Sequence, residues 1–218
     1  MHKAEENYLK AIYSLTTAGN SEVGTNILAE HLSTKASSVT DMAKRLAEKN
    51  LIHYTPYKGF RLSDAGRDIA LQIIRKHRLW ESFLVEKLSF KWYEVHEIAE
   101  QLEHIQSEML TNRLDEFLGY PKFDPHGDPI PDKNGVVAKL NTIVLSELEI
   151  GESAQIMGVK DSSAPFLQYL ESQQLVLGTR LSLVERFPFD QSLKLEVNRQ
   201  DTLTISQLVS KNLVVQRL

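Results

Sequence analysis

The sequence predicts a mainly α-helical protein that ends in a small β domain. Up to about residue 118, apolar residues recur with helical spacing, and only one short pair of strand-like runs interrupts them. After a proline-rich break at residues 121–135, the pattern changes to short β-type runs divided by turn signals. A chain of 218 residues, of which 42% are apolar, is long enough for one large domain or two to three small ones.

Composition argues against disulfide-bonded, secreted and membrane-spanning proteins. The net charge of −4 does not by itself favour nucleic acid, although the first 62 residues carry a slight excess of basic residues. The absence of cysteine excludes disulfides and thiolate metal sites. Charged residues interrupt the start of the chain, and no apolar run approaches 18 residues, so we expect neither a signal peptide nor a membrane span. The expected location is the cytoplasm.

Residues 1–63 are predicted to form a winged helix. The periodicity indicates three helices and then two strands, at residues 4–17, 25–32, 36–49, 51–54 and 60–62. A helix-turn-helix followed by a hairpin suits double-stranded DNA, because the third helix fits the major groove and the wing reaches the phosphates. The residues expected to contact DNA are Lys35, Ser37, Ser38, Thr40, Lys44, Lys58 and Arg61. The alternative is a small helical domain that binds protein.

Residues 64–140 are predicted to form a second, helical domain. Ser63 is a good N-cap for a long helix over 64–88, and further helices are expected over 95–104 and 107–118. The prolines and glycines of residues 121–135 predict a loop that contains Asp124 and His126. A broad apolar surface suggests a dimer interface, although an ordinary core competes with it; it comprises Trp80, Phe83, Leu84, Leu110, Leu114 and Phe117.

The run Val-His-Glu-Ile-Ala-Glu-Gln-Leu-Glu-His at residues 95–104 is the strongest indication of function. On a helix, His96, Glu100 and Glu103 share one face, and His104 lies beside them. A divalent cation needs such converging nitrogen and oxygen donors, although a solvated helix face would look similar. His77 and Glu81 are also spaced one turn apart and could share an ion, although a plain surface contact is the simpler interpretation.

Residues 141–218 are predicted to form an SH3-like barrel. Short β-type runs separated by turn signals, with one helix over about 164–173, fit a small barrel of this kind. The expected strands lie at residues 142–145, 154–157, 180–184, 193–197 and 212–216.

The order of these parts resembles the diphtheria-toxin-repressor family of metal-dependent transcriptional regulators, in its long form with an SH3-like domain. The resemblance covers nearly the whole chain. It rests on five motifs in the right order: Glu-Asn-Tyr-Leu-Lys-Ala-Ile-Tyr, Ala-Ser-Ser-Val-Thr-Asp-Met, Arg-Lys-His-Arg-Leu-Trp-Glu, the run at 95–104, and Pro-His-Gly-Asp-Pro-Ile-Pro. It implies a homodimer that binds a palindromic operator when Mn²⁺ or Fe²⁺ is bound, and that represses metal-uptake genes.

The resemblance also implies the ligands. A primary site is implied at Asn7, Glu100, Glu103 and His104, and a second site at His77, Glu81 and His96. A related site of the long manganese-type members would here use Glu81, Asp124, His126 and Asp161. Glu100 replaces the Cys of iron-type members, and an oxygen-and-imidazole shell suits Mn²⁺ or Fe²⁺. Two residues depart from the family: Asn7 stands where manganese-type members usually have Asp, and Lys10 replaces a carboxylate of the short members.

Two other functions remain open from the sequence. A metalloenzyme could use the same His and Glu residues, but the run at 96–100 lacks the second His of the zinc-protease signature, and no Glu-x-x-His pair occurs in the chain. We therefore do not expect an enzyme. The second alternative is a metal-independent winged-helix adaptor that binds protein through its SH3-like domain.

Overall fold

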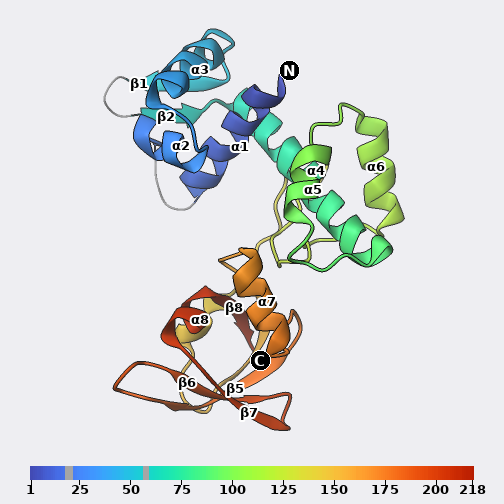
Figure 1. The fold of residues 1–218 in the computed structure, drawn as a ribbon. Coiled ribbons are helices and arrows are strands. Elements are labelled where there is room, and N and C mark those ends of the chain that lie inside the picture. Colours follow the sequence, from blue (N-terminus) through green and yellow to red (C-terminus); the bar gives the residue numbers. More distant parts are fainter. Residues whose placement is uncertain (18–21, 56–58) are drawn as a thin grey trace. The chain divides into compact units, whose positions relative to one another are not determined.

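The protein is described here by a computed structural model that covers residues 1–17, 22–55 and 59–218 (Figure 1). The chain divides into two compact units, and each draws on three separate segments. Unit 1 comprises residues 1–77, 100–113 and 131–136, and unit 2 comprises residues 78–99, 114–130 and 137–218. Side chains far apart in the sequence therefore meet within each unit. The three domains expected from the sequence, 1–63, 64–140 and 141–218, stay predictions.

A winged helix opens unit 1 (Figure 1). Its elements are α1 (Lys3–Thr17), α2 (Thr25–His31), α3 (Ala36–Glu48), β1 (Ile52–Thr55) and β2 (Gly59–Leu62). They lie within one or two residues of the predicted ranges. The apolar positions that predicted the helices form their common core, in which the most completely buried side chains include Leu9, Ile12, Leu28, Val39 and Leu46.

The base of the wing requires a glycine. Gly59 has a φ of +129°, and a Cβ there would lie 2.4 Å from the carbonyl oxygen of Val23. Val23 and Phe60 exchange two backbone hydrogen bonds of 2.9 Å, which hold β2 against the segment before α2. Because any side chain at position 59 would push these backbones apart, the glycine fixes where the wing leaves the helices.

Three helices follow, α4 (Asp64–Leu88), α5 (His96–Leu102) and α6 (Glu108–Phe117). The 25-residue α4 has the predicted bounds, and the Ser63 hydroxyl accepts a hydrogen bond from the Gly66 N–H, as an N-cap should. The helix expected over 95–104 is shorter than predicted. It ends at Leu102, whose carbonyl accepts a hydrogen bond from the Ile105 N–H in a tight turn. Glu103 and His104 therefore lie in this turn and not on the helix face.

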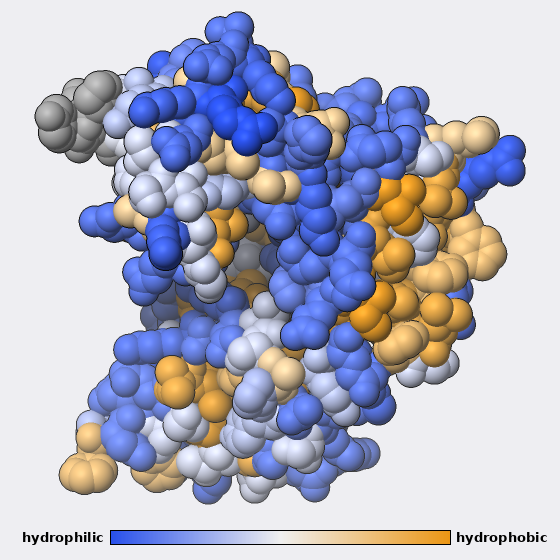
Figure 2. Space-filling view, turned by 45° about the horizontal axis from the view of Figure 1, so that its top comes forward, coloured by the Kyte–Doolittle hydropathy of each residue, from blue (hydrophilic) through white to orange (hydrophobic). Residues whose placement is uncertain are grey.

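The predicted apolar surface is partly core and partly exposed. Leu84 and Leu114 are buried, so these two members of the predicted surface belong to the interior. On α6, Leu110 and Phe117 are exposed on one side of the helix, and Met109 beside them is 68% exposed. Figure 2 shows apolar side chains gathered over α6, which leaves a face that a second protein surface could cover.

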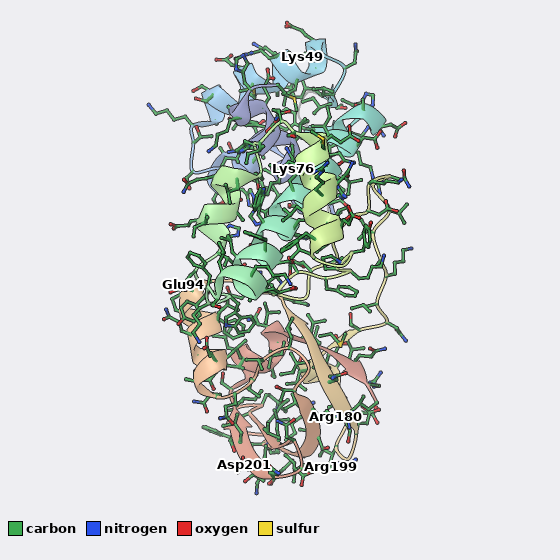
Figure 3. All side chains as sticks on the ribbon, turned by 90° about the vertical axis from the view of Figure 1, so that its right-hand side faces the viewer. Lys49, Lys76, Glu94, Arg180, Arg199 and Asp201 are labelled. Carbon is green, nitrogen blue, oxygen red and sulfur yellow. The ribbon has the colours of Figure 1, made fainter. Side chains whose placement is uncertain are left out.

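The C-terminal part of unit 2 is one antiparallel sheet with the strand order β3-β8-β4-β5-β6-β7. Its strands are β3 (Ile143–Val144), β4 (Ser153–Val159), β5 (Arg180–Arg186), β6 (Leu193–Val197), β7 (Asp201–Ile205) and β8 (Leu213–Arg217). A short 3-10 turn (Leu145–Glu147) and two helices, α7 (Ala164–Ser172) and α8 (Gln207–Asn212), complete it. The sequence predicted five strands and α7; it did not predict β7 or α8. Arg180, Arg199 and Asp201 mark the end of the sheet where β6 turns into β7 (Figure 3).

Candidate metal centres

A carboxylate of α1 fixes the orientation of His104 in unit 1. Nδ1 of His104 lies 2.6 Å from Oε2 of Glu6, and the other oxygen of Glu6 accepts a 2.7 Å hydrogen bond from Gln106. Glu6 is buried, so this pairing is shielded from water. With Nδ1–H donated to Glu6, the lone pair of His104 is on Nε2. A carboxylate behind an imidazole is a common support for a metal-binding histidine.

Three buried polar atoms of unit 1 have no hydrogen-bond partner among the described residues: Oδ1 of Asn7, which follows Glu6 on α1, Oε1 of Glu103 and Nε2 of His104. The last two lie 3.7 Å apart. Leaving a buried polar group unpaired costs roughly 1–3 kcal/mol, so these atoms call for an explanation. Two oxygens and one imidazole nitrogen are suitable ligands for Mn²⁺ or Fe²⁺. The residues present therefore fit a divalent ion.

Lys10 occupies the other side of Glu103. Its Nζ lies 2.5 Å from Oε1 of Glu100, 2.6 Å from Oε2 of Glu103 and 3.3 Å from Nδ1 of His77. Nδ1 of His77 is in turn 2.7 Å from Oε2 of Glu103. Burial by itself favours the protonated form of Glu103, but the hydrogen bond from His77 and the charge of Lys10 outweigh it and hold the pKa of Glu103 below its usual value. Glu103 is therefore an ionised carboxylate.

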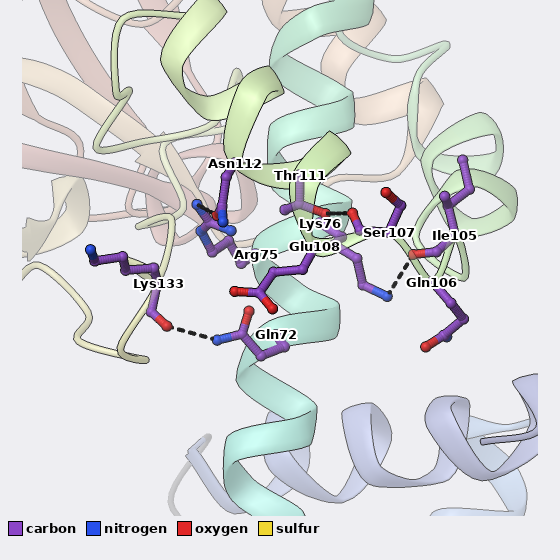
Figure 4. A pocket seen from close by; sticks show the side chains of 10 residues that line it. All are labelled: Gln72, Arg75, Lys76, Ile105, Gln106, Ser107, Glu108, Thr111, Asn112 and Lys133. Atoms are coloured by element: carbon purple, nitrogen blue, oxygen red, sulfur yellow. Dashed lines mark hydrogen bonds between the residues drawn. The ribbon is translucent and has the colours of Figure 1, made fainter.

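A hollow of about 420 Å³ lies between α4, the segment before α6 and α6 itself (Figure 4). The Arg75 guanidinium, which is buried, donates to the side-chain oxygen of Asn112, and Nζ of Lys76 donates to the Ile105 carbonyl. Burial lowers the pKa of Lys76, while the charges of Glu6 and Glu103 act against that shift. Lys76, which lies along α4 in Figure 3, is thus a further positive charge close to these two carboxylates.

A second candidate centre lies in unit 2, where Glu81, Asp124 and His126 are all buried. Each offers one ligand atom, and the three atoms lie within 4.8 Å of one another. Nε2 of His126 lies 2.8 Å from the Trp92 carbonyl and donates to it. Nδ1 of His126 then faces the carboxylates, 3.6 Å from Glu81 and 3.9 Å from Asp124. Two carboxylates and one imidazole nitrogen again form a donor set for a hard divalent ion.

The proline-rich loop is seated on β4 within unit 2. The Val159 N–H donates to the His126 carbonyl, and Gly127 comes so close that a Cβ there would lie 2.0 Å from the Met157 carbonyl oxygen. The Asp124 carboxylate also accepts from two backbone N–H groups of its own loop. Asp161 follows β4 two residues after Val159, and its carboxylate accepts a hydrogen bond from the Ser163 N–H. The Asp161 carboxylate is not part of the group formed by Glu81, Asp124 and His126, so its role as a ligand stays a prediction.

The pKa values of one acidic and one basic group in this second centre are raised. Burial raises the pKa of Asp124 to about 7, and the charges of Glu81 and Asp128 add to the shift. Burial alone would lower the pKa of His126, but its hydrogen bond to Glu81 and the charges of Glu81 and Asp124 raise it to about 9. Protons are therefore held where a metal ion would bind, and the ion must displace them.

The remaining predicted ligands are His77 and His96. His77 lies in unit 1 with Glu103 and Lys10, one helical turn before Glu81 on α4. His96 begins α5 and is exposed, with Nδ1 3.4 Å from Oε1 of Glu81. A shared site of His77, Glu81 and His96 stays a prediction. Sequence reasoning missed Glu6, although it immediately precedes Asn7 in the first motif.

The predicted DNA-contacting residues that the structure describes lie away from the core of the winged helix. Lys35, the N-cap of α3, and Ser37, Ser38 and Lys44 on α3 are exposed, whereas Val39, Ala43 and Leu46 are buried. Thr40 is half-buried, and its hydroxyl donates to the Ala36 carbonyl within the helix. Arg61 is exposed on β2, and Lys58 lies outside the described residues.

Comparison with known proteins agrees with this architecture. Models of the iron-dependent repressor N-terminal DNA-binding domain, of its metal-binding and dimerisation domain, and of the FeoA domain match residues 1–60, 63–132 and 143–217. The iron-dependent repressor IdeR of Mycobacterium leprae is 32% identical over 161 residues, which cover 70% of this chain and 69% of IdeR. IdeR of Mycobacterium tuberculosis is 35% identical over 126 residues. This match covers 58% of this chain and 54% of that relative, so it spans about half of the relative's length.

Solved structures resemble the chain over nearly its whole length. A manganese-dependent transcriptional repressor in complex with manganese has a TM-score of 0.87 and 32% identity, and the match covers 98% of this chain and 100% of that one. ScaR with bound Cd²⁺ has a TM-score of 0.79 and 31% identity, with 98% and 99% covered. The fold and the buried donors thus define a winged-helix protein with metal-binding centres. The chain belongs to the iron-dependent repressor family, which includes the diphtheria toxin repressor.

Proposed function

We propose that this protein is a metal-dependent transcriptional repressor that binds palindromic DNA as a homodimer and acts in the cytoplasm. Its activating ion is Mn²⁺ or Fe²⁺, and it regulates genes of metal uptake. The observation that carries the proposal is the set of unpartnered buried atoms on Asn7, Glu103 and His104. They join α1 of the winged helix to the turn after α5, so an ion held there ties the DNA-binding elements to the rest of unit 1.

The mechanism follows from where the ligands are attached. An ion favours whichever arrangement lets Asn7, Glu103 and His104 reach it together, and it shifts the protein only by its difference in affinity for the arrangements. In a dimer, the arrangement of each winged helix sets the distance between two recognition helices, which must match half-sites about 34 Å apart. Typical coupling of this kind is about 1–3 kcal/mol per ion. Carboxylate and imidazole donors serve binding here, and we propose no catalysis.

Within the proposed primary site, Glu6 is a positioning residue. It does not need to touch the ion, because it presents Nε2 of His104 by holding Nδ1. In the second centre Glu81, Asp124 and His126 bind another ion, and Asp161 is a candidate fourth donor that would have to move to reach it, because its carboxylate lies outside this group of three. The comparisons favour this function over both alternatives, since the solved relatives are named as manganese-activated or manganese-dependent repressors.

Selection from random double-stranded DNA, with and without Mn²⁺, tests the function directly. The wild type should enrich a palindrome only with metal, and its affinity should fall steeply with salt because phosphate contacts release counterions. Glu103→Gln keeps the shape of the side chain and removes its charge. It should weaken Mn²⁺-dependent DNA binding at least about tenfold, an effect equal to about 1.4 kcal/mol.

Glu171→Gln in α7 of the C-terminal domain is the matched control and should bind as the wild type does, because its carboxylate pairs with Lys91 and not with a proposed ligand. Equal enrichment of DNA with and without metal would favour the metal-independent adaptor. The absence of any enriched DNA would reject the proposed repressor.

A further inference from the structure

The hollow between α4 and α6 is polar and carries an excess of positive charge. Of its ten lining residues, only Ile105 is apolar (Figure 4). Three lining residues, Arg75, Lys76 and Lys133, are basic and one, Glu108, is acidic, which leaves a formal excess of two positive charges. All ten residues belong to unit 1. Such a lining suits a hydrophilic anion and offers almost no apolar surface to an acyl chain or an aromatic ring.

Hydrogen bonds hold the walls of this hollow in place. The guanidinium of Arg75, a residue that is only 2% exposed, donates a 3.2 Å hydrogen bond to the side-chain oxygen of Asn112 and so ties α4 to α6. The Gln72 amide donates to the Lys133 carbonyl at 3.1 Å and ties α4 to the end of the proline-rich loop (Figure 4). A site whose walls are already fixed loses less entropy when a ligand enters it.

The lining also contains donors and an acceptor that the described residues do not use. The Lys76 ammonium donates to the Ile105 carbonyl at 3.4 Å, which leaves two of its three hydrogens for a ligand. Among the residues that the structure describes, neither the Lys133 ammonium nor the Glu108 carboxylate has a hydrogen bond or an ion pair. Lys133 is exposed, so its long side chain can turn toward a ligand. Two cations can thus bind an anionic group while a carboxylate accepts hydrogen bonds from hydroxyl groups.

The size of the hollow separates a small organic anion from an inorganic one. Its volume of about 420 Å³ is equal to that of roughly fourteen water molecules at about 30 Å³ each. An inorganic phosphate has only five heavy atoms and would leave most of this space to water. A phosphate monoester carries a charge of about −2 at neutral pH, which matches the excess positive charge of the lining. The carbon skeleton attached to it must be hydrophilic, because the lining is.

We propose that this hollow binds a sugar phosphate. Lys76 and Lys133 bind the phosphate group, and Glu108 accepts hydrogen bonds from the sugar hydroxyls. A nucleotide carries the same phosphate group but would place its base against polar side chains, with no aromatic ring on which to stack. The proposal goes beyond the proposed function, because none of the proposed metal ligands or DNA-contacting residues lines the hollow.

Equilibrium dialysis of the full-length protein against labelled glucose 6-phosphate, in buffer without metal ions, tests the site. Glucose, inorganic phosphate and adenosine monophosphate serve as competitors. Glucose 6-phosphate should bind at least about tenfold more tightly than each of the three, because only it satisfies both the cations and the carboxylate. No binding in the millimolar range would overturn the proposal. Equal competition by inorganic phosphate would reveal a site for any oxyanion, and stronger competition by adenosine monophosphate would reveal a nucleotide site; either result overturns it as well.

Substitutions locate the bound ligand. Lys76→Gln combined with Lys133→Gln removes both proposed phosphate contacts and should weaken the binding of glucose 6-phosphate about tenfold or more. Lys87→Gln combined with Lys139→Gln is the matched control, since it removes two positive charges, one of them also from α4, outside the hollow. It should bind as the wild type does.

Lys133→Gln alone decides the matter if the double variant folds poorly, because Lys133 is exposed and its substitution leaves the packing unchanged. It should also weaken binding. If the control double variant loses as much affinity as the variant in the hollow, general charge attraction explains the binding and the site is wrong. These measurements contain neither metal nor DNA, so a failure here leaves the proposed repressor function standing, and a failure of that function leaves this site standing.

Discussion

At the scale of single residues, Asp124 and His126 of the second centre hold protons that a metal ion must displace. The pKa values of Asp124 and His126 both lie above their usual values, at about 7 and about 9. The folded metal-free protein therefore binds more protons than the unfolded chain between the usual and the raised values. The same side chains form the proposed ligand set together with Glu81. Stability and metal affinity should consequently depend on pH in opposite directions.

This gives a prediction for the metal-free protein. Protonated His126 contributes to the free energy of unfolding fully below pH 6.5, and this contribution is lost as the pH rises through 9. The contribution of protonated Asp124 is lost as the pH approaches and passes 7. The free energy of unfolding should fall between pH 6.5 and 9, by at most about 3 kcal/mol for His126. Denaturant titration at several pH values measures it. Mn²⁺ should bind more tightly over the same range, and His126→Gln should flatten the fall; a fall of equal size in that variant would exclude His126 as its source.

The residue scale also shows where sequence reasoning stops. The motif at 95–104 singled out Glu103 and His104 as candidate ligands, but it placed them on a helix that ends at Leu102. The spacing of residues in the sequence does not reveal the turn after Leu102, which brings the side chain of His104 to α1. Glu6 escaped notice because a buried carboxylate next to a ligand has no signature of its own in one sequence. Its role becomes visible only when His104, 98 positions later, is found 2.6 Å away.

At the scale of elements, the sequence predicts the helix α4, which has regular apolar spacing, but not the largely polar strand β7. The bounds of α4 were found because it has an N-cap, no proline and continuous helical spacing. β7 was missed because its run Asp-Thr-Leu-Thr-Ile is largely polar and exposed. The turn before it carries positive φ values at Asn198 and Arg199, where a hairpin signal would normally include glycine. Pairing with β6, a tertiary effect, makes this segment a strand.

The loop of residues 121–135 approaches β4 most closely at Gly127. Gly127 has a φ of +88° and no room for a Cβ against the Met157 carbonyl, so Gly127→Ala should force the loop off β4. His126 would move with it. The variant should lose Mn²⁺ at the second centre and be cleaved faster by protease between residues 121 and 135. Limited proteolysis and equilibrium dialysis measure both effects.

Gly119→Ala is the control for this change. Gly119 has a similar φ of +76°, but nothing lies within 4 Å of its Cβ position, so its substitution should cost about 1 kcal/mol and no more. If the two variants are cleaved at the same rate, the close approach at Gly127 is not what holds the loop in place.

At the scale of the whole molecule, the proposed binding of a palindrome requires two copies of the chain. We predict that the exposed apolar side chains of α6 form the surface for this pairing, since Leu110 and Phe117 lie seven residues apart on one side of the helix. Phe117 also contacts Phe83 of α4, so the surface is continuous with a packed aromatic cluster. No helix among residues 1–17, 22–55 and 59–218 is long and apolar enough to cross a membrane.

Leu110→Glu combined with Phe117→Glu should therefore produce a monomer. Burying two carboxylates in an apolar contact costs far more than the contact can return, so association should fail while the fold and the primary metal site persist. Sedimentation velocity measures the change in mass, and dialysis with Mn²⁺ checks the site. Phe189→Glu is the control, because Phe189 is fully exposed in the turn between β5 and β6. A double variant that remains dimeric would move the interface elsewhere, whereas a monomer that binds Mn²⁺ but no longer holds the palindrome would link dimerisation by α6 to operator binding.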